Sequence, residues 1–230
     1  MILITIGVLA LQGGFVEHIN LVRRAAEQLK IHVDAIEVRT AQELARCDGL
    51  IIPGGESTTI SFVAAQSRLL EPLRHYVKVQ KKPVWGTCAG LILLSDEANA
   101  TKKGGQELVG GLGVRVHRNH FGRQIESFQS DLELPFLGEG AAPFPGVFIR
   151  APVVEEILKG SGPGEDVQVL AKLPGRLNKI KAGVSQANTK DDSGDIIAVK
   201  QSNVLGTSFH PELTNDVRIH AWWLKSILGQ

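Results

Sequence analysis

The chain has 230 residues and only two cysteines, Cys47 and Cys88. Two thiols cannot build the disulfide framework of a small secreted protein, so a reducing, cytoplasmic compartment is expected. The apolar run over residues 2–11 has no basic leader before it and no convincing cleavage site after it. These absences argue against a signal peptide, and we expect this run to form a buried strand.

An excess of charge of either sign is also missing. Lys and Arg number 25 against 24 Asp and Glu, so neither a nucleic acid nor a membrane surface is an expected partner. The sequence shows no nucleotide-binding or metal-binding motif, and no cofactor is expected. A hydrophobic content of 43% suffices for one sizeable core, which predicts a single domain over residues 1–230.

Strand patterns and helix patterns alternate over about the first hundred residues. Apolar runs predict strands, and apolar residues spaced by three and four predict helices. The predicted strands are residues 2–11, 33–38, 49–52 and 84–85, and the predicted helices are residues 15–29, 41–45, 58–79 (with a break near Pro72) and 89–95. This alternation predicts an α/β fold: a mainly parallel sheet with helices on both faces, in three layers.

From about residue 108 the pattern changes to short strands separated by turns. We expect strands at residues 112–116, 128–134, 147–149, 167–173 and 196–199, as antiparallel additions to the main sheet. A last strand, residues 204–209, precedes a helix with an apolar stripe from Val217 to Leu228. Trp222 and Trp223 lie on that helix and are expected to serve packing.

Cys88 stands in the segment Gly-Thr-Cys-Ala-Gly, residues 86–90, between a predicted strand and a predicted helix. Strand, tight glycine turn and helix form the pattern of a nucleophile elbow, here with sulfur in place of oxygen. The glycines permit a sharp turn, and the helix N-terminus favours the thiolate. Cys88 is therefore a predicted nucleophile, with a small buried hydrophobe as the alternative. Cys47 has no such surroundings and is interpreted as structural.

His210 and Glu212 are the predicted partners of Cys88. A nucleophilic thiol needs a base, and the base is usually oriented by a third group. His210 follows the last predicted strand, so it should emerge at the carboxyl edge of the sheet, where the elbow also opens. The bend at Pro211 can turn the Glu212 carboxylate toward the imidazole. The alternative is a histidine that simply ends a strand.

Other histidines compete for the role of base. His120 follows Arg118 and residue 119 in a predicted loop and is the serious rival to His210. His18, His75 and His220 lie on predicted helices, where a solvated or structurally satisfied role is expected.

A glycine pair follows the third predicted strand, in residues 53–58. Acyl transfer needs backbone donors where the carbonyl oxygen becomes an oxyanion. The Gly54-Gly55 peptide can turn its N–H inward, so Gly55 and Ala89 are the predicted oxyanion donors. The alternative is an ordinary glycine turn in which Ser57 caps the next helix.

Several segments together resemble the class I glutamine amidotransferases, and among them the glutaminase subunits of pyridoxal phosphate synthase. These segments are residues 7–13, 53–59, 86–90, 118–124, 147–152 and 208–214. The elbow and the His-Pro-Glu ending are shared by many amidotransferases. The sequences Gly-Glu-Ser-Thr, Arg-Asn-x-Phe-Gly-Arg-Gln and Phe-Ile-Arg-Ala-Pro are the specific part. The long polar connection from about residue 174 to 195 departs from shorter relatives and contains none of these motifs.

The resemblance implies hydrolysis of L-glutamine to glutamate and ammonia by the triad Cys88, His210 and Glu212. It implies a hetero-oligomer in which the ammonia passes to a separate (β/α)₈ barrel subunit that builds pyridoxal phosphate from a pentose phosphate and a triose phosphate. Arginines suit the carboxylate of glutamine, and acceptors such as Glu56 suit its ammonium. By similarity the glutamine-binding residues are Gly55, Glu56, Ser57, Arg118, Ile149 and Arg150.

Other functions remain open at this point. A cysteine peptidase or chaperone of the related α/β type also carries a cysteine elbow, although the His-Pro-Glu ending is not expected there. An amidotransferase that feeds a different synthase is a second alternative. An inactive regulatory subunit is a third, and the presence of all three triad residues argues against it.

Overall fold

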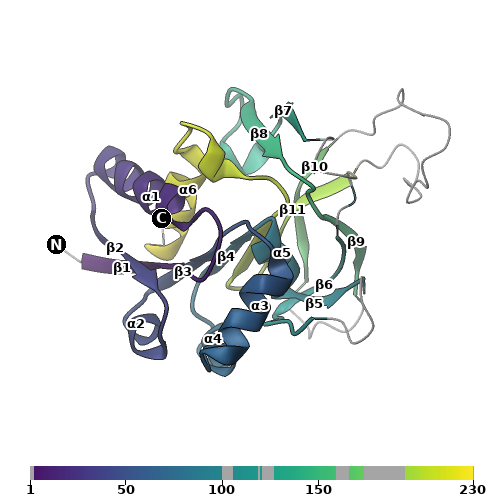
Figure 1. Ribbon diagram of the computed structural model, residues 1–230. Helices are drawn as coiled ribbons and strands as arrows, with labels where there is room; N and C mark the ends of the chain where they lie inside the picture. Colours follow the sequence, from purple (N-terminus) through teal and green to yellow (C-terminus); the bar gives the residue numbers. More distant parts are fainter. Residues whose placement is uncertain are drawn as a thin grey trace.

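The computed structural model describes residues 3–99, 106–118, 120, 127–158, 166–173 and 195–229. Within these residues the centre is a ten-stranded sheet of order β2-β1-β3-β4-β12-β11-β9-β6-β5, with β10 paired to β11 (Figure 1). Its first half is parallel and comprises β2 (His32–Val38), β1 (Leu3–Leu9), β3 (Gly49–Ile52), β4 (Val84–Thr87) and β12 (Val204–Thr207). The mainly parallel start predicted from the sequence is confirmed.

The second half of the sheet is mixed. It comprises β11 (Asp195–Gln201), β9 (Val153–Ile157), β6 (Leu112–His117), β5 (Ser95–Ala98) and β10 (Gln168–Leu173). β11 runs antiparallel to its three neighbours, whereas β5 pairs with β6 in parallel. The sequence did not predict β5 or β9, because Ser-Asp-Glu-Ala and Val-Val-Glu-Glu-Ile lack a clear alternation of apolar and polar residues.

Helices cover both faces of the sheet (Figure 1). On one face α1 (Phe15–Leu29) packs beside α6 (Arg218–Ile227), and on the other lie α3 (Ser57–Gln66), α4 (Leu70–Lys78) and α5 (Ala89–Leu94). A short helix, α2 (Ala41–Ala45), follows β2. No helix in the described part of the chain has the length and apolar character needed to cross a bilayer.

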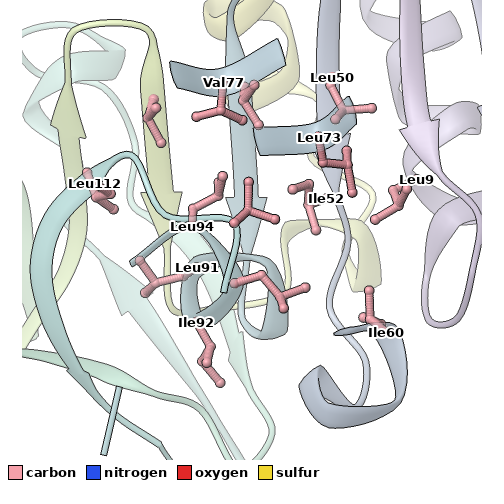
Figure 2. Packing of buried hydrophobic residues seen from close by; sticks show 14 of the residues in the cluster. Leu9, Leu50, Ile52, Ile60, Leu73, Val77, Leu91, Ile92, Leu94 and Leu112 are labelled. Atoms are coloured by element: carbon pink, nitrogen blue, oxygen red, sulfur yellow. The ribbon is translucent and has the colours of Figure 1, made fainter. Parts of the chain in front are cut away.

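Each face has its own hydrophobic cluster. Figure 2 shows the cluster under α3, α4 and α5, where side chains from the strands, such as Leu50 and Ile52, meet Ile60, Leu73 and Leu91 from the helices. The second cluster joins α1 and α6 to the other face, around the fully buried Trp85 ring. Trp223 packs on that ring with a centroid distance of 5.9 Å. Trp222 lies 4.7 Å from the Phe136 ring, so both tryptophans serve packing as expected.

Two local predictions were wrong. The break in the predicted helix 58–79 lies between α3 and α4, where Arg68 adopts a φ of 57°, and not at Pro72. Pro72 lies in the first turn of α4, where a missing N–H breaks no intrahelical bond. The strands β7 (Phe128–Leu132) and β8 (Phe144–Phe148) form a separate two-stranded sheet and do not extend the main one. Their Phe128 and Phe148 rings stack at 4.7 Å.

Gly86 and Gly90 allow α5 to touch the strands directly. A Cβ atom at Gly90 would lie 2.0 Å from the carbonyl oxygen of Ile52, at the end of β3. A Cβ atom at Gly86 would lie 2.4 Å from the backbone of Gly90 itself. The two glycines are therefore required for contact between helix and sheet, which places the turn at Cys88.

We expect the Gly90→Ala variant to lose about 3 kcal/mol or more of unfolding free energy, because neither backbone in this contact can move aside. Gly140→Ala is the matched control, since Gly140 has a φ of 71° and nothing within 4 Å of a built Cβ. The control should lose only about 1–2 kcal/mol, the cost of holding alanine in the left-handed backbone conformation. Urea unfolding measures both, and similar losses in the two variants would contradict the contact.

Candidate active site

Cys88 occupies the sharp turn between β4 and α5. Its backbone has a φ of 47° and a ψ of −100°, an uncommon conformation for any residue with a side chain. The turn is held from both sides: the Cys88 N–H donates to the carbonyl oxygen of Thr207 at 2.8 Å, and its carbonyl oxygen accepts from the Ile92 N–H at 3.2 Å. Strained backbone of this kind collects at functional sites.

His210 lies beside the thiol. The residue is 8% exposed, and its ring is hydrogen-bonded through Nδ1 to the Glu212 Oε1 atom at 2.7 Å. Burial alone would lower the pKa of His210, but its interactions with the neighbouring Cys88 and Glu212 and their negative charges raise it to about 10. The imidazole is thus held ready to carry a proton.

Glu212 returns toward His210 through a 3-10 turn, η3 (Pro211–Leu213), that begins at Pro211. Its side chain is 2% exposed. Burial opposes ionisation, but contacts with His18 and His210 outweigh it and hold the pKa of Glu212 far below the usual range. The structure therefore brings Cys88, His210 and Glu212 together in one buried group.

Glycines from two loops make room for this group. A Cβ atom at Gly54 would lie 2.4 Å from His210 Cε1, and one at Gly14 would lie 3.1 Å from the Glu212 carboxylate. Gly13 has a φ of 102° and approaches the Gly54 carbonyl oxygen so closely that no side chain fits. We did not predict Gly13 and Gly14 as part of the site, although a glycine pair after the first strand is the same signal that singled out Gly54 and Gly55.

The predicted oxyanion donors are Gly55 and Ala89. Ala89 is the first residue of α5, so its N–H faces the helix entrance beside Cys88. The Gly54 carbonyl oxygen accepts a hydrogen bond from the Gly14 N–H at 3.1 Å, which fixes the Gly54-Gly55 peptide. In a trans peptide the Gly55 N–H then points to the side opposite Gly14.

Glu56 caps α3, whereas the alternative considered from the sequence had Ser57 in that position. Its carboxylate accepts hydrogen bonds from the N–H groups of Thr58 and Thr59 and from both threonine hydroxyls. Burial raises the pKa of Glu56, but these hydrogen bonds prevail and lower it to about 2. The residue therefore supplies a fixed negative charge at the helix N-terminus.

Ser57 joins Arg118 to Gln106. The Arg118 guanidinium donates to Ser57 Oγ at 3.2 Å, and Ser57 Oγ donates to Gln106 Oε1 at 2.9 Å. Arg118 is 8% exposed, and burial lowers the pKa of its guanidinium against the opposing charge of Glu56. Gln106 Nε2 is buried and has no hydrogen-bond partner among the described residues. Nothing in the sequence around Gln106 predicted its place here.

Ile149 and Arg150 follow β8. The Ile149 carbonyl oxygen lies 4.0 Å from the Cys88 sulfur. Arg150 is exposed and has a φ of 46°, so the backbone is strained at a second point near the thiol. Residues 119 and 121–124 of the Arg118 motif, and residues 174–194 of the polar connection, lie outside the described residues.

The other predicted candidates are placed apart from this arrangement. His120, the rival base, forms an ion pair with Asp195 at 3.1 Å. Cys47 is 1% exposed, and burial raises the pKa of its thiol to about 11, which fits a structural role. No group of three or more potential ligands in the described part of the chain could hold a metal ion.

His18 was expected to be solvated or simply satisfied within the fold. It is fully buried, and its Nε2 atom lies 3.3 Å from Glu212 Oε2, next to the triad. A histidine on a helix gives no sign in the sequence of what its helix faces, so this contact required the structure.

Comparisons with known proteins identify the family of this chain. Residues 8–228 match the SNO glutamine amidotransferase family. The chain is 48% identical to a probable pyridoxal 5'-phosphate synthase subunit PDX2 of Arabidopsis thaliana, over 96% of this chain and 85% of that protein. It is 40% identical to the pyridoxal 5'-phosphate synthase subunit PdxT of Herpetosiphon aurantiacus, over 96% and 98%.

A crystal structure of a glutamine amidotransferase superimposes with a TM-score of 0.73 at 39% identity, covering 98% of this chain and 99% of that one. The likeness thus extends over nearly the whole chain. The chain belongs to the SNO glutamine amidotransferase family.

Proposed function

We propose that the protein hydrolyses L-glutamine to glutamate and ammonia and supplies the ammonia to a pyridoxal phosphate synthase partner. Its relatives are subunits of that synthase. The observation that carries the proposal is the buried hydrogen bond of 2.7 Å between His210 and Glu212, with the Cys88 thiol next to the imidazole. A thiol, a base and an orienting carboxylate are the parts that nucleophilic hydrolysis of an amide needs.

In this reaction the Cys88 thiolate attacks the side-chain amide carbon of glutamine. His210 donates its proton to the leaving nitrogen, ammonia departs, and a γ-glutamyl thioester remains on Cys88. His210, now neutral, takes a proton from water, and the hydroxide attacks the thioester to release glutamate and the thiolate. Glu212 stabilises the imidazolium form in both steps.

The backbone N–H groups of Ala89 and Gly55 would bind the oxyanion formed in both attacks. Neither donor is charged, so the site stabilises the developing charge without binding glutamine's neutral amide strongly. This arrangement favours the transition state over the ground state.

The cradle of Glu56, Ser57, Arg118 and Gln106 would hold the amino-acid end of glutamine. The Arg118 guanidinium suits the α-carboxylate, and Gln106 Nε2, which has no hydrogen-bond partner among the described residues, is a second donor nearby. The fixed charge of Glu56 suits the ammonium group. The exposed Arg150 and the Ile149 carbonyl oxygen complete the set on the other side of the thiol.

The partner in this proposal is a (β/α)₈ barrel subunit that joins the chain in a cytoplasmic hetero-oligomer. Both Cys47 and Cys88 are free, which agrees with a reducing compartment. Delivery to an attached partner keeps ammonia from bulk water, where most of it would be protonated and no longer nucleophilic. In this proposal the chain is a single domain, residues 1–230, that carries all the groups needed for hydrolysis.

Cys88→Ser should abolish glutaminase turnover, with a loss of about 10⁴-fold or more, because it removes the nucleophile. A glutamine-like chloroketone should label Cys88 and leave Cys47 unlabelled, as the high pKa of the buried Cys47 thiol requires. Cys47→Ala, the control, should retain turnover. Labelling of Cys47 alone, or full activity in Cys88→Ala, would show that the nucleophile is elsewhere.

His210→Asn should lower kcat by several orders of magnitude, and Glu212→Gln should be milder because the amide still fills the orienting position. The alkaline limb of kcat/KM should lie near pH 10 in the parent protein, where His210 loses its proton. Glu212→Gln should move this limb to lower pH, because it removes the negative charge that raises the pKa of His210. His120→Asn serves as the control. A larger loss of kcat in His120→Asn than in His210→Asn would show that His120, and not His210, is the base.

The oxyanion site should depend on the partner. In the described part of the chain a single hydrogen bond, from Gly14 to Gly54, holds the Gly54-Gly55 peptide, and Gly13 and Gly55 are exposed, so a docked subunit could reach them. We expect the isolated chain to turn over slowly and saturating synthase subunit to raise kcat by about 10²–10³-fold, the value of one oxyanion donor. Steady-state ammonia release measures both states. Equal rates would rule out this gating and leave the triad proposal unaffected.

A further inference from the structure

Two buried histidines lie behind the carboxylate of Glu212. His18 on α1 and His220 on α6 are both 0% exposed, and His18 Nδ1 lies 3.0 Å from His220 Nε2. The other ring nitrogen of His18 lies 3.2 Å from Thr87 Oγ1 and 3.3 Å from Glu212 Oε2. The hydrolysis described above uses neither histidine.

The Glu212 carboxylate lies between two imidazoles. Oε1 is bound to His210 Nδ1, whereas Oε2 is buried, has no hydrogen-bond partner among the described residues, and lies 3.3 Å from His18 Nε2. The 3.3 Å separation is slightly longer than the usual range, which fits an N–H that is shared with Thr87. Because the terminal torsion of a glutamate is soft, a carboxylate held at one oxygen alone could rotate away from His210.

The surroundings of His220 and His18 determine which nitrogen of each ring carries the proton. Complete burial lowers the pKa of His220 well below its ordinary value, so His220 is neutral. Its Nδ1 atom has no hydrogen-bond partner among the described residues. An unpaired acceptor is tolerated more readily than an unpaired N–H, so the His220 proton belongs on Nε2. His220 then donates to His18 Nδ1, which leaves the His18 proton on Nε2, facing Glu212 and Thr87.

We propose that His18 is a positioning residue of the triad: its ring, oriented by His220, donates Nε2–H to the second oxygen of Glu212 and fixes the carboxylate against His210. The inference rests on the proposed function. The titratable groups that lie against the His18 ring are Glu212 and His220.

His18→Gln and His18→Asn form a matched pair that separates this role from packing. The glutamine amide reaches the position of Nε2 and can still donate to Glu212. The asparagine amide reaches only the position of Nδ1, so it keeps the contact with His220 and loses Glu212. With the full chain, saturating synthase subunit and L-glutamine, Asn should lower kcat by about 10–100-fold, the usual effect of an outer partner on a functional group. Gln should stay near the parent value, and KM should change in neither.

Alkylation of Cys88 by iodoacetamide across pH is the second readout, and it needs no glutamine. A displaced carboxylate stabilises the imidazolium less, so the thiolate forms less readily and the alkylation midpoint should move to higher pH in His18→Asn. It should not move in His18→Gln. Trp223→Leu is the packing control: it removes a ring that packs on Trp85 in the same cluster. It should lower stability and leave the midpoint unchanged.

Equal kcat values and equal midpoints in His18→Asn and His18→Gln, whether normal or reduced, would overturn the proposal. Should His18→Asn fail to fold, His220→Gln and His220→Leu repeat the comparison one residue farther from Glu212, with Gln again the milder change and equal values again decisive. If the parent protein released no ammonia from glutamine but the midpoints still separated the pair, the positioning role would stand and the proposed function would fall.

Discussion

The close contact between α5 and the carboxyl ends of β3 and β4 is the constraint on which the site depends. Gly90 lies against the Ile52 carbonyl oxygen, and Gly86 lies against Gly90. This contact leaves the chain no room for a wider turn, so Cys88 adopts its strained backbone conformation and presents its thiol at the sheet edge. The apolar cluster under α3, α4 and α5 holds the helix in that position (Figure 2).

Electrostatics then acts on groups that packing has already placed. His210 and Glu212 are each more than nine-tenths buried, which disfavours charge on both. They are charged because each is bound to a partner, and the opposing effects leave the pKa of His210 raised and that of Glu212 lowered. A buried pair of this kind is expensive to break by removing one partner. The site is therefore held firmly at the pair to which we assign the proton transfer.

The sequence predicted the α/β fold and brought out Cys88, His210 and Glu212, because their signals are local: a glycine elbow and a histidine-proline bend, each after an apolar strand. Contacts between distant segments could not be predicted from the sequence. Gln106 meets Ser57, and His18 meets Glu212 across 194 positions in the chain, and neither pairing has a sequence signature. The alternative with Ser57 as the cap of α3 was wrong, because both Ser57 and Glu56 suit the end of a helix and only the backbone angles decide between them.

Cys88 and His210 each follow one of two neighbouring strands, and this has a consequence for evolution and engineering. Thr87 of β4 pairs directly with Thr207 of β12, so Cys88 and His210 are aligned by one parallel ladder. The ladder, and not the length of the intervening chain, sets their separation. Segments between these strands, including residues 174–194, can therefore gain or lose residues among relatives while the distance from sulfur to imidazole stays constant. A slip of a single residue in the ladder would separate them.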